Sequence, residues 1–477
     1  MNATGYTPEE SIAAIATALS PAALGIIRVS GKNAIELVSQ IFSRPQTLKT
    51  TPGNTVVYGW IQDSTNNFYK IDEVLVSVFR GPKSFTGEDM AEISCHGGIA
   101  VVTEIFKLLL KIGFRQANPG EFTFRAFING KADLTKAEAV QEIVSAKTSD
   151  SRGHATDRLA GNLYREIDDI KHLLVTTLAA IEAEIEYPED EETIADAFDP
   201  KNLQEARQRL SSLIHSWASE KLYQDGAKIV LCGKTNAGKS SLFNTLLKEE
   251  RAIVSDIHGT TRDWIESWAS FAGIPARLFD TAGLRESEDV IEQHGIQRTK
   301  DLTQDADLIL YVIDGTEGLS QEDEVFLSDF LSAKNTEIPV IIVINKADRL
   351  ADCTKILEAV KEKLGSLLVH HNIPLIPVSA KKGEGIDLLV QKTKELLVSD
   401  ISTTRETVGL GSQRQKCCTE EALESVVHAL EAAGQGYSLD AVVQDIEDAL
   451  DSLGEITGSV TPEDILDTVF SKFCLGK

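Results

Sequence analysis

Gly233-Lys234-Thr235-Asn236-Ala237-Gly238-Lys239-Ser240 decides the fold of the central part of the chain. The stretch fits G-x-x-x-x-G-K-[ST]; it follows the apolar run 228–232 and precedes a helical segment that begins at Ser241. Glycines in such a loop let backbone N–H groups approach phosphate oxygens, while Lys239 adds a positive charge and Ser240 a ligand for Mg²⁺. The order strand, loop, helix predicts a phosphate-binding loop, although this motif alone does not separate ATP from GTP.

The residues around this loop alternate between short apolar runs and helix-length segments. The apolar runs are 227–232, 276–279, 308–313, 340–344 and 375–377. Strands that alternate with helices are typical of a parallel sheet covered by helices. The sequence therefore predicts an α/β nucleotide-binding domain over residues 223–389.

The base specificity is predicted from Asn345-Lys346-Ala347-Asp348, which follows a buried run. A carboxylate at Asp348 can accept from both N1–H and the 2-amino group of guanine, whereas adenine offers neither donor. Ser379, Ala380 and Lys381 follow the next run and are expected to close over the base. The pattern favours GTP over ATP.

Two further segments are predicted to be the switches. Asp280-Thr281-Ala282-Gly283 follows a strand, so Asp280 is expected to hold Mg²⁺ through water and Gly283 to leave room beside the γ-phosphate. Gly259-Thr260-Thr261-Arg262-Asp263 is the other switch, with Thr261 as the second Mg²⁺ ligand beside Ser240. The complete predicted GTP site is Asn236, Ala237, Gly238, Lys239, Ser240, Ser241, Ser255, Asp256, Ile257, His258, Gly259, Thr260, Thr261, Asp280, Thr281, Ala282, Gly283, Asn345, Lys346, Asp348, Ser379, Ala380 and Lys381.

Length and composition agree with a multidomain globular chain. The 477 residues predict about three domains, and no run approaches the length of a membrane span. The start, 1–11, has neither the basic residues nor the apolar core of a targeting segment, and six cysteines without Cys-x-x-Cys spacing argue against a disulfide framework. We expect a cytoplasmic protein with no membrane partner.

The flanking regions differ from the centre in their pattern of apolar residues. Residues 1–130 mix β-branched runs with helical patterns and predict an α+β domain. Residues 131–222 and 390–477 carry amphipathic patterns such as Ile170, Leu174 and Ile181, which lie on one helix face. Two separated amphipathic stretches can pack on each other as one discontinuous all-α domain. The predicted fold is therefore multidomain, with an α+β N-terminal domain and an α/β P-loop G domain inserted into a helical domain.

The five central motifs resemble those of the translation-factor-related GTPases. Members similar to Ras place a water-orienting glutamine directly after D-x-x-G, and here that position is Leu284, which cannot orient water. Glu286 is the nearest candidate catalytic residue, acting through a second water; the alternative is a solvated switch residue. Asn236 could supply an oxygen to a monovalent cation, or it is a plain loop residue.

The whole chain resembles the MnmE (TrmE) family of bacterial tRNA-uridine modification GTPases. The blocks that carry this resemblance, apart from the nucleotide motifs, are Gly25-Ile-Ile-Arg28-Val-Ser-Gly31, Ser84-Phe-Thr-Gly-Glu88-Asp89, Cys95-His-Gly-Gly98, Pro119-Gly-Glu-Phe122, Arg125-Ala-Phe-Ile-Asn129-Gly-Lys131, Gly454-Glu-Ile-Thr-Gly458 and Phe473-Cys-Leu-Gly-Lys477.

The resemblance implies a cofactor and an assembly. It implies an N-terminal domain that forms a homodimer and binds a formyl-tetrahydrofolate through Arg28, Glu92, Lys131 and Lys477. A carboxylate such as Glu92 suits the amidine-like face of a pterin, and the cations suit the anionic tail. Without the resemblance, Arg28 and Lys131 would be interpreted as surface charges. Cys474 would be a functional thiol; a prenylation site is rejected because Gly476 and Lys477 do not fit that motif.

The resemblance also implies a reaction. K⁺ would bind through Asn236, Ser255, Ile257 and Thr260 and pair two G domains so that Glu286 can act. Hydrolysis would drive a conformational cycle, while an FAD- and NADH-dependent subunit, MnmG, completes a heterotetramer with this GTPase. The complex would add an aminomethyl or carboxymethylaminomethyl group at C5 of the wobble uridine, position 34, of its tRNA substrates.

Two alternative functions and the net charge are weighed against this predicted function. A ribosome-assembly GTPase switch would want a basic RNA-binding appendage such as a KH domain, and none is evident. A stand-alone folate-dependent transferase leaves the GTP motifs unexplained. The formal charge of −26 comes from 47 Lys and Arg against 73 Asp and Glu, and many of the acids crowd the predicted helical domain. We therefore expect the partner subunit to supply many of the contacts that bind tRNA.

Overall fold

The computed structural model describes residues 10–63, 69–186, 200–249, 266–280, 305–332, 338–370, 372–398, 408–435, 439–460, 462–473 and 476. They form two compact units, each with its own core. The first unit comprises residues up to 141, 157–211 and 412–477, and the second comprises 142–156 and 212–411. Within the described ranges, no helix combines the length and the apolar character needed to span a bilayer.

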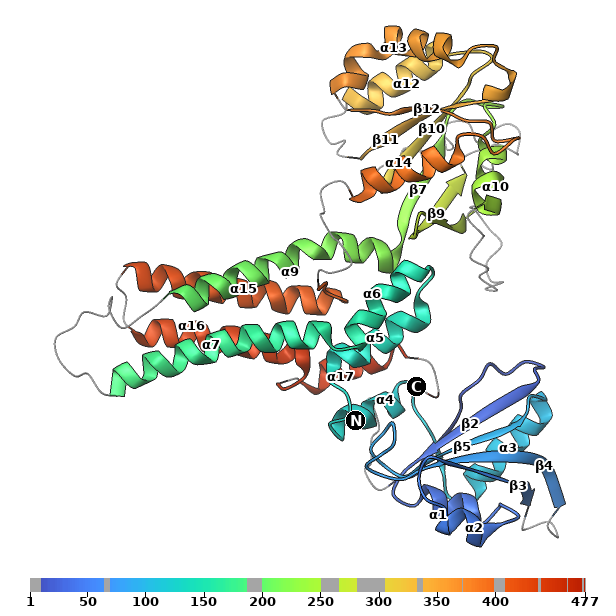
Figure 1. Cartoon of the computed structure of the whole chain (residues 1–477), viewed down its shortest axis with the longest axis vertical. Helices are drawn as coiled ribbons and strands as arrows, with labels where there is room; N and C mark the ends of the chain where they lie inside the picture. The colour runs from blue at the N-terminus through green and yellow to red at the C-terminus, as the bar shows by residue number, and fades with distance from the viewer. Residues whose placement is uncertain are drawn as a thin grey trace, which may run out of the picture. The chain divides into compact units, whose positions relative to one another are not determined.

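The N-terminal part of the first unit is a six-stranded sheet with helices on one face (Figure 1). The strand order is β3-β4-β5-β2-β1-β6, and every neighbouring pair is antiparallel except β1 and β6. Val102, Ile105 and Leu109 of helix α3 are buried in the core with alternate residues of the strands. The elements are β1 (Ile12–Ile15), β2 (Leu24–Ser30), α1 (Ala34–Ser39), α2 (Pro45–Thr50), β3 (Thr55–Asp63), β4 (Tyr69–Phe79), β5 (Met90–His96), α3 (Ile99–Lys111) and β6 (Arg115–Gln116).

The opposite face of this sheet carries exposed apolar side chains. Tyr58 of β3 pairs with Leu75 of β4, which pairs with Ser94 of β5. Leu75 is 48% exposed and Leu24, on β2, is 63% exposed. Because side chains alternate between the two faces of a strand, the buried residues between them face the helices. On the same face Ile12, Ala14 and Met90 are buried with Phe122, so among the described residues of this unit only the part of the face with the exposed side chains lacks apolar cover.

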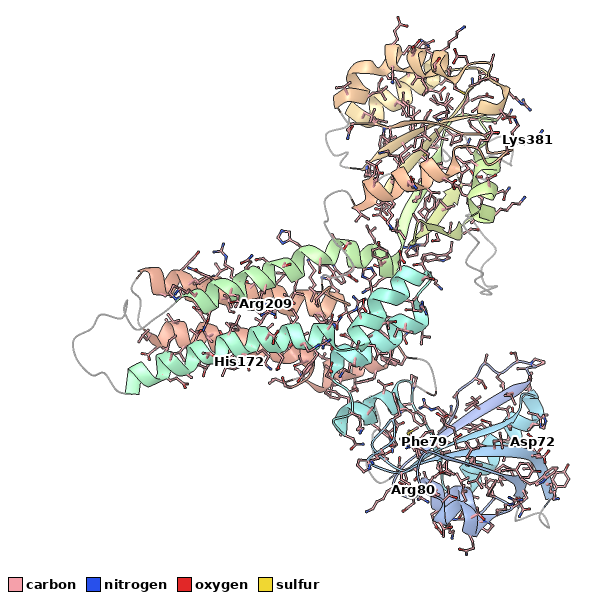
Figure 2. The ribbon with its side chains drawn as sticks, viewed as in Figure 1. Asp72, Phe79, Arg80, His172, Arg209 and Lys381 are labelled. Atoms are coloured by element: carbon pink, nitrogen blue, oxygen red, sulfur yellow. The ribbon has the colours of Figure 1, made fainter. Side chains whose placement is uncertain are left out.

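The helical part of the first unit joins two distant stretches of sequence. Helix α7 (Asn162–Glu186) buries Ile170, Leu174 and Ile181, and it packs beside α16 (Leu439–Thr457), which in turn packs on α15 (Gln413–Gln435) (Figure 1). Arg209 on α9 (Lys201–Asp225) binds Glu166 of α7 through two hydrogen bonds of 2.8 Å (Figure 2). The predicted discontinuous helical domain is therefore confirmed.

Three further helices connect the bundle to the N-terminal sheet within the first unit. They are α4 (Glu121–Ile128), α5 (Leu134–Ser145) and α17 (Glu463–Phe470). Phe470 packs edge-on against Phe124, with ring centroids 5.2 Å apart. Phe473 joins the same buried cluster with Leu134. The segment after α17 is thereby fixed on α4.

The second unit holds a sheet with the order β12-β11-β10-β7-β9-β8 (Figure 1). The five predicted strands are its five parallel strands, and β8, which lies outside that prediction, adds an antiparallel edge. Alternate residues of β7 enter two separate cores, one on each face. The elements are β7 (Ala227–Cys232), α10 (Lys239–Glu249), β8 (Glu266–Phe271), β9 (Ile274–Asp280), β10 (Leu308–Asp314), α12 (Gln321–Ser332), β11 (Val340–Asn345), the 3₁₀ turn η2 (Ala347–Arg349), α13 (Cys353–His370), β12 (Leu375–Pro377) and α14 (Ile386–Val398).

The second unit also includes short pieces of the predicted helical domain. In α6 (Ser149–Leu159), His154 stacks on Tyr223 at 4.5 Å and lies 2.8 Å from Glu220. Helix α14 runs through the predicted boundary at 389, and Leu389, Val390 and Val398 pack in the core of the sheet. The domain limits at 130, 222 and 389 stay a prediction.

Candidate functional site

The loop 233–238 leaves the end of β7 and leads directly into α10. Gly233 has φ of 133°, and a Cβ there would lie 2.1 Å from the carbonyl oxygen of Val312. Asn236 adopts a left-handed φ of 65°. The amine of Lys239 donates to the carbonyl oxygens of Gly233 and Lys234, both at 2.8 Å. The loop therefore curls over the lysine at the N-terminus of α10, which is a favourable arrangement for an anion.

The two predicted Mg²⁺-binding residues that the structure describes, Ser240 and Asp280, lie side by side. The hydroxyl of Ser240 donates to Oδ2 of Asp280 at 2.8 Å, and Asp280 is buried at the end of β9. Strands β7 and β9 are parallel neighbours, so their carboxyl ends meet at this edge. Hydroxyl and carboxylate oxygens are the hard donors that Mg²⁺ prefers.

Asn345 links the phosphate loop to the base end of the site. This buried residue ends β11 and donates from Nδ2 to the carbonyl oxygen of Ala237 at 3.0 Å. Its Oδ1 accepts from the backbone N–H of Ala380 at 3.1 Å. A Cβ at Gly238 would lie 2.2 Å from Nδ2 of Asn345, so glycine is needed for this approach. One amide thus fixes three segments relative to each other.

Asp348, the residue predicted to recognise guanine, is held by a hydrogen bond to one of its carboxylate oxygens. The hydroxyl of Ser379 donates to Oδ1 of Asp348 at 2.7 Å. This hydrogen bond is the main reason that the pKa of the Asp348 carboxyl lies below its ordinary value. A carboxylate that is ionised at neutral pH can accept the two N–H donors of guanine.

Lys346 is fixed beside Asp348 by a contact that the sequence did not reveal. Its amine forms an ion pair with Asp314 at the end of β10. Burial alone would raise the pKa of Asp314, but the hydrogen bonds from Lys346 and Thr316 outweigh it and lower that pKa. Lys346 itself has a left-handed φ of 62°. The pair holds the aliphatic stem of Lys346 along the site.

Part of this site lines a cavity of about 580 Å³, within the size range of small-molecule sites; Lys239, Ser240 and Asp280 are not among its lining residues. It brings together the predicted residues Gly238, Ser241, Asn345, Lys346, Asp348, Ala380 and Lys381, the last of which extends from the loop after β12 (Figure 2). The lining residues that sequence reasoning missed are Asn244, Thr245, Lys248, Arg349, Lys382 and Gly383. One signal was available, since Asn244, Thr245 and Lys248 lie within three turns of Lys239 on the same helix.

Some predicted residues lie outside the described ranges. They are Ser255, Asp256, Ile257, His258, Gly259, Thr260, Thr261, Thr281, Ala282, Gly283, Glu286, Cys474 and Lys477. Their roles stay predictions.

A second group of predicted residues lies in the first unit, on the exposed face of the N-terminal sheet. Arg28 of β2 and Glu92 of β5 are register partners, and Nε of Arg28 lies 3.0 Å from Oε1 of Glu92. The guanidinium stacks between Phe85 and Phe122, at 5.2 and 5.1 Å from the ring centroids. Burial lowers the pKa of Arg28, and the ion pair with Glu92 opposes that shift. A guanidinium held this way remains charged.

Arg28 also contacts the far end of the described chain. It donates to the carbonyl oxygen of Gly476 at 3.0 Å, across 448 positions of sequence. Gly476 is buried, with φ of 89°, and a Cβ there would lie 3.1 Å from Cα of Ala16. Lys131, by contrast, is exposed after α4, and its stem runs beside Gly87. The structure thus brings Arg28, Glu92 and the neighbour of Lys477 together.

Comparison with known proteins covers both units. The family described as "GTP-binding protein TrmE N-terminus" matches residues 11–131, and the "MnmE helical domain" family matches residues 134–474. The tRNA modification GTPase MnmE of Treponema denticola is 50% identical, covering 99% of each chain. That of Carboxydothermus hydrogenoformans is 41% identical, covering 98% of this chain and all of the relative.

Solved structures provide a weaker likeness. Era of Aquifex aeolicus, bound to GDP and AlF₄⁻, is 28% identical over 42% of this chain and 66% of that one, with a TM-score of 0.30. The matches over the full length of the sequence establish that the chain belongs to the MnmE family of tRNA modification GTPases.

Proposed function

We propose that this GTPase is a K⁺-dependent homodimer that works with an FAD- and NADH-dependent MnmG subunit in the cytoplasm. The complex adds an aminomethyl or carboxymethylaminomethyl group at C5 of uridine 34 in tRNA. A formyl-tetrahydrofolate supplies the one-carbon unit, and GTP hydrolysis drives the conformational cycle.

The observation that carries the folate assignment is the position of Arg28. Its guanidinium lies 3.0 Å from the carboxylate of Glu92 and donates to the carbonyl oxygen of Gly476 at 3.0 Å. Arg28 therefore contacts a second proposed folate ligand, Glu92, and the residue before a third, Lys477. Glu92 is 31% exposed and can face a pterin, while Phe85 and Phe122 offer flat apolar surfaces. A carboxylate, a cation and aromatic rings are the groups that a charged heterocycle needs.

The open face of the N-terminal sheet supports the homodimer. Val56, Leu75 and Leu24 are 58%, 48% and 63% exposed on three strands of this face. Val56 and Leu75 lie on the neighbouring strands β3 and β4, whereas Leu24 pairs with His96; exposed apolar side chains gathered on one face are typical of an interaction site. A second copy would cover it, and Arg28 with Glu92 would then lie at the dimer interface.

The GTP site supports a cycle that is completed by the switches. Ser240 and Thr261 would hold Mg²⁺ directly, Asp280 would hold it through water, and Lys239 would neutralise phosphate charge. Asn236, Ser255, Ile257 and Thr260 would bind K⁺, and Glu286 would orient the attacking water through a second water. Asn236 already lies in the described phosphate loop, ahead of the buried Lys239.

The charge distribution supports a separate partner for tRNA. The chain carries a formal charge of −26, which is unfavourable for tight binding of a polyanion. The described helix α15 alone includes Glu420, Glu421, Glu424 and Glu431. We infer that MnmG supplies most of the contacts to the tRNA phosphates.

Nucleoside mass spectrometry of tRNA is the test of this function. A strain that lacks the protein should lose the modified wobble uridine, and a Cys474→Ser strain should lose it too while the purified variant keeps GTP hydrolysis. Full modification in the deletion strain would rule out the proposed reaction. Modification in the Cys474→Ser strain would rule out only the thiol.

The cation is tested separately. Replacing K⁺ by Na⁺ should slow GTP hydrolysis by at least about tenfold, because the smaller ion fits oxygen ligands placed for K⁺ poorly. Asn236→Ala should remove the difference between the two salts. Equal rates in both salts for the unmodified protein would rule out the cation site.

A further inference from the structure

A second cavity, of about 490 Å³, lies within the first unit and belongs to none of the sites above. Its walls come from the end of α4 and the loop after it, the start of α5, the N-terminal half of α7 and the turn after α16. Two of the sequence blocks that carry the family resemblance line it, Arg125–Lys131 and Gly454–Gly458, and the proposed function gives the second of these no role. The volume lies within the roughly 300–1,000 Å³ of small-molecule sites.

Three lysines from three different segments line this cavity. They are Lys131 after α4, Lys136 on α5 and Lys171 on α7. Lys136 lies 3.5 Å from Asp133 and 6.0 Å from the ring of Tyr164, and Lys171 donates to the hydroxyl of Ser459 at 3.2 Å. These contacts are long or weak for an ammonium group. The amines can therefore turn to an anionic ligand at little cost.

The cavity also offers acceptors. Asp133 and Asp168 line it together with the hydroxyl-bearing Thr457 and Ser459. Asp133 caps α5, because its carboxylate accepts the backbone N–H of Lys136 at 3.0 Å. Two carboxylates beside three amines suit a ligand that carries both carboxylates and N–H donors. A ligand that is only a string of phosphates would be repelled by both aspartates.

A series of contacts connects this cavity to the Arg28 site. Phe85 stacks on Arg28, and the next residue, Thr86, accepts a hydrogen bond from Nδ2 of Asn129 at 2.7 Å. The following residue, Gly87, lies against the stem of Lys131, which lines the cavity. The loop 85–87 therefore runs from the Arg28 site to the edge of the cavity, and Lys131 belongs to both.

We propose that this cavity binds a γ-linked oligoglutamate tail on the folate, with Lys136 and Lys171 binding carboxylates beyond the first glutamate. The inference rests on the folate part of the proposed function. Each added γ-glutamyl unit brings one carboxylate and one amide, so the lysines can bind the carboxylates while Asp133 and Asp168 accept amide N–H groups. The preferred cofactor of this GTPase is then a polyglutamylated folate.

Binding of matched folates to the full-length protein tests the proposal. Isothermal titration calorimetry would compare 5-formyl-tetrahydrofolate carrying one glutamate with the form carrying three. The triglutamyl form should bind about tenfold more tightly, the effect of two half-buried ion pairs. Lys136→Ala combined with Lys171→Ala should remove this advantage and leave the affinity for the monoglutamyl form within about twofold.

A matched control uses two exposed lysines on α3, in the same unit. Lys107→Ala combined with Lys111→Ala removes the same charge from the chain and should keep the tenfold advantage. Melting temperatures of both double variants would show that each protein is folded. An advantage that falls equally in both would reflect net charge and would overturn the proposal.

The remaining outcomes separate the two inferences. Equal affinity of the unmodified protein for both folates would overturn the tail site but keep the folate assignment. Failure of both folates to bind would overturn the folate assignment and the tail site together. Equal affinity for both folates, with weaker binding of a tRNA anticodon stem-loop only in the Lys136 and Lys171 double variant, would assign the cavity to RNA phosphates instead.

Discussion

The two sheets of this protein place their functional groups in different ways. The sheet of the second unit is parallel apart from its edge, and hydrophobic cores cover both faces. Its polar groups therefore gather where strands end, as at Asp280, Asp314 and Asn345. The N-terminal sheet is mostly antiparallel, and Arg28 and Glu92 are register partners on the face opposite α3, where Phe122 of α4 packs against the Arg28 guanidinium.

The difference decides whether one chain alone can enclose each site. At strand ends, loops from several parallel strands converge, and backbone groups of one chain surround the ligand. An exposed sheet face is flat, so another surface must enclose a ligand placed there. The nucleotide cavity is thus formed within one unit, whereas the Arg28 site is expected to need a second copy.

The largest effect is expected at the strand-end site. Lys239→Ala removes a buried cation whose amine binds two loop carbonyls. GTP hydrolysis should fall by about 10²–10³-fold, the loss typical of one preorganised charge-stabilising donor. Phosphate release with saturating GTP measures it, and Lys107→Ala is the control. Hydrolysis within about threefold of normal would show that the lysine does not act on the transition state.

A smaller effect is expected from a change of base specificity. Asp348→Asn replaces an acceptor with an amide that presents N–H donors toward those of guanine. GDP affinity should fall by about 10²-fold, and xanthosine diphosphate, which has a carbonyl oxygen at C2, should bind better than GDP. Fluorescent nucleotide titration measures both. Unchanged preference for GDP would contradict the role of Asp348.

The open face is tested by adding charge to it. Leu75→Asp should raise the dissociation constant of the homodimer by about tenfold or more, because the charge would be buried in the interface. The matched control is Val369→Asp on α13, where the side chain is 84% exposed outside both cores. Sedimentation equilibrium compares the two. Equal dimer dissociation in both variants would mean that the dimer forms elsewhere.

The smallest effect is expected from pH. The pKa of Asp348 is lowered in the folded protein by the hydrogen bond from Ser379, so its carboxylate persists above the ordinary pKa of about 3.9 and is lost only as the pH falls below it. GDP affinity should therefore stay constant between about pH 8 and pH 5. Ser379→Ala should return the pKa of Asp348 toward its ordinary value, so the variant should lose affinity at a higher pH than the unmodified protein, near about pH 4. A tenfold loss by pH 5 in the unmodified protein would place the controlling group elsewhere.

Sequence predicted the strand-end site better than the exposed face. The loop before Lys239 and the segment from Asn345 have fixed spacing because backbone atoms must meet phosphate and guanine. The ion pair of Lys346 with Asp314 depends on two parallel strands being neighbours, which local pattern does not encode. The amphipathic pattern assigned residues from 390 onward to the helical domain and did not show that the helix 386–398 packs on the core of the second unit. The Lys136 and Lys171 cavity could not be predicted from local pattern because more than 300 positions separate its first wall from its last.

The hydrogen bond between Arg28 and Gly476 has a consequence for biosynthesis. At roughly 5–20 residues per second, Gly476 leaves the ribosome some 20–90 s after Arg28, since 448 positions separate them. During that interval the whole G domain is synthesised and can fold. Until then Arg28 of the nascent N-terminal domain lacks this carbonyl as a partner, and the Arg28 site can be completed only after translation has passed every other domain.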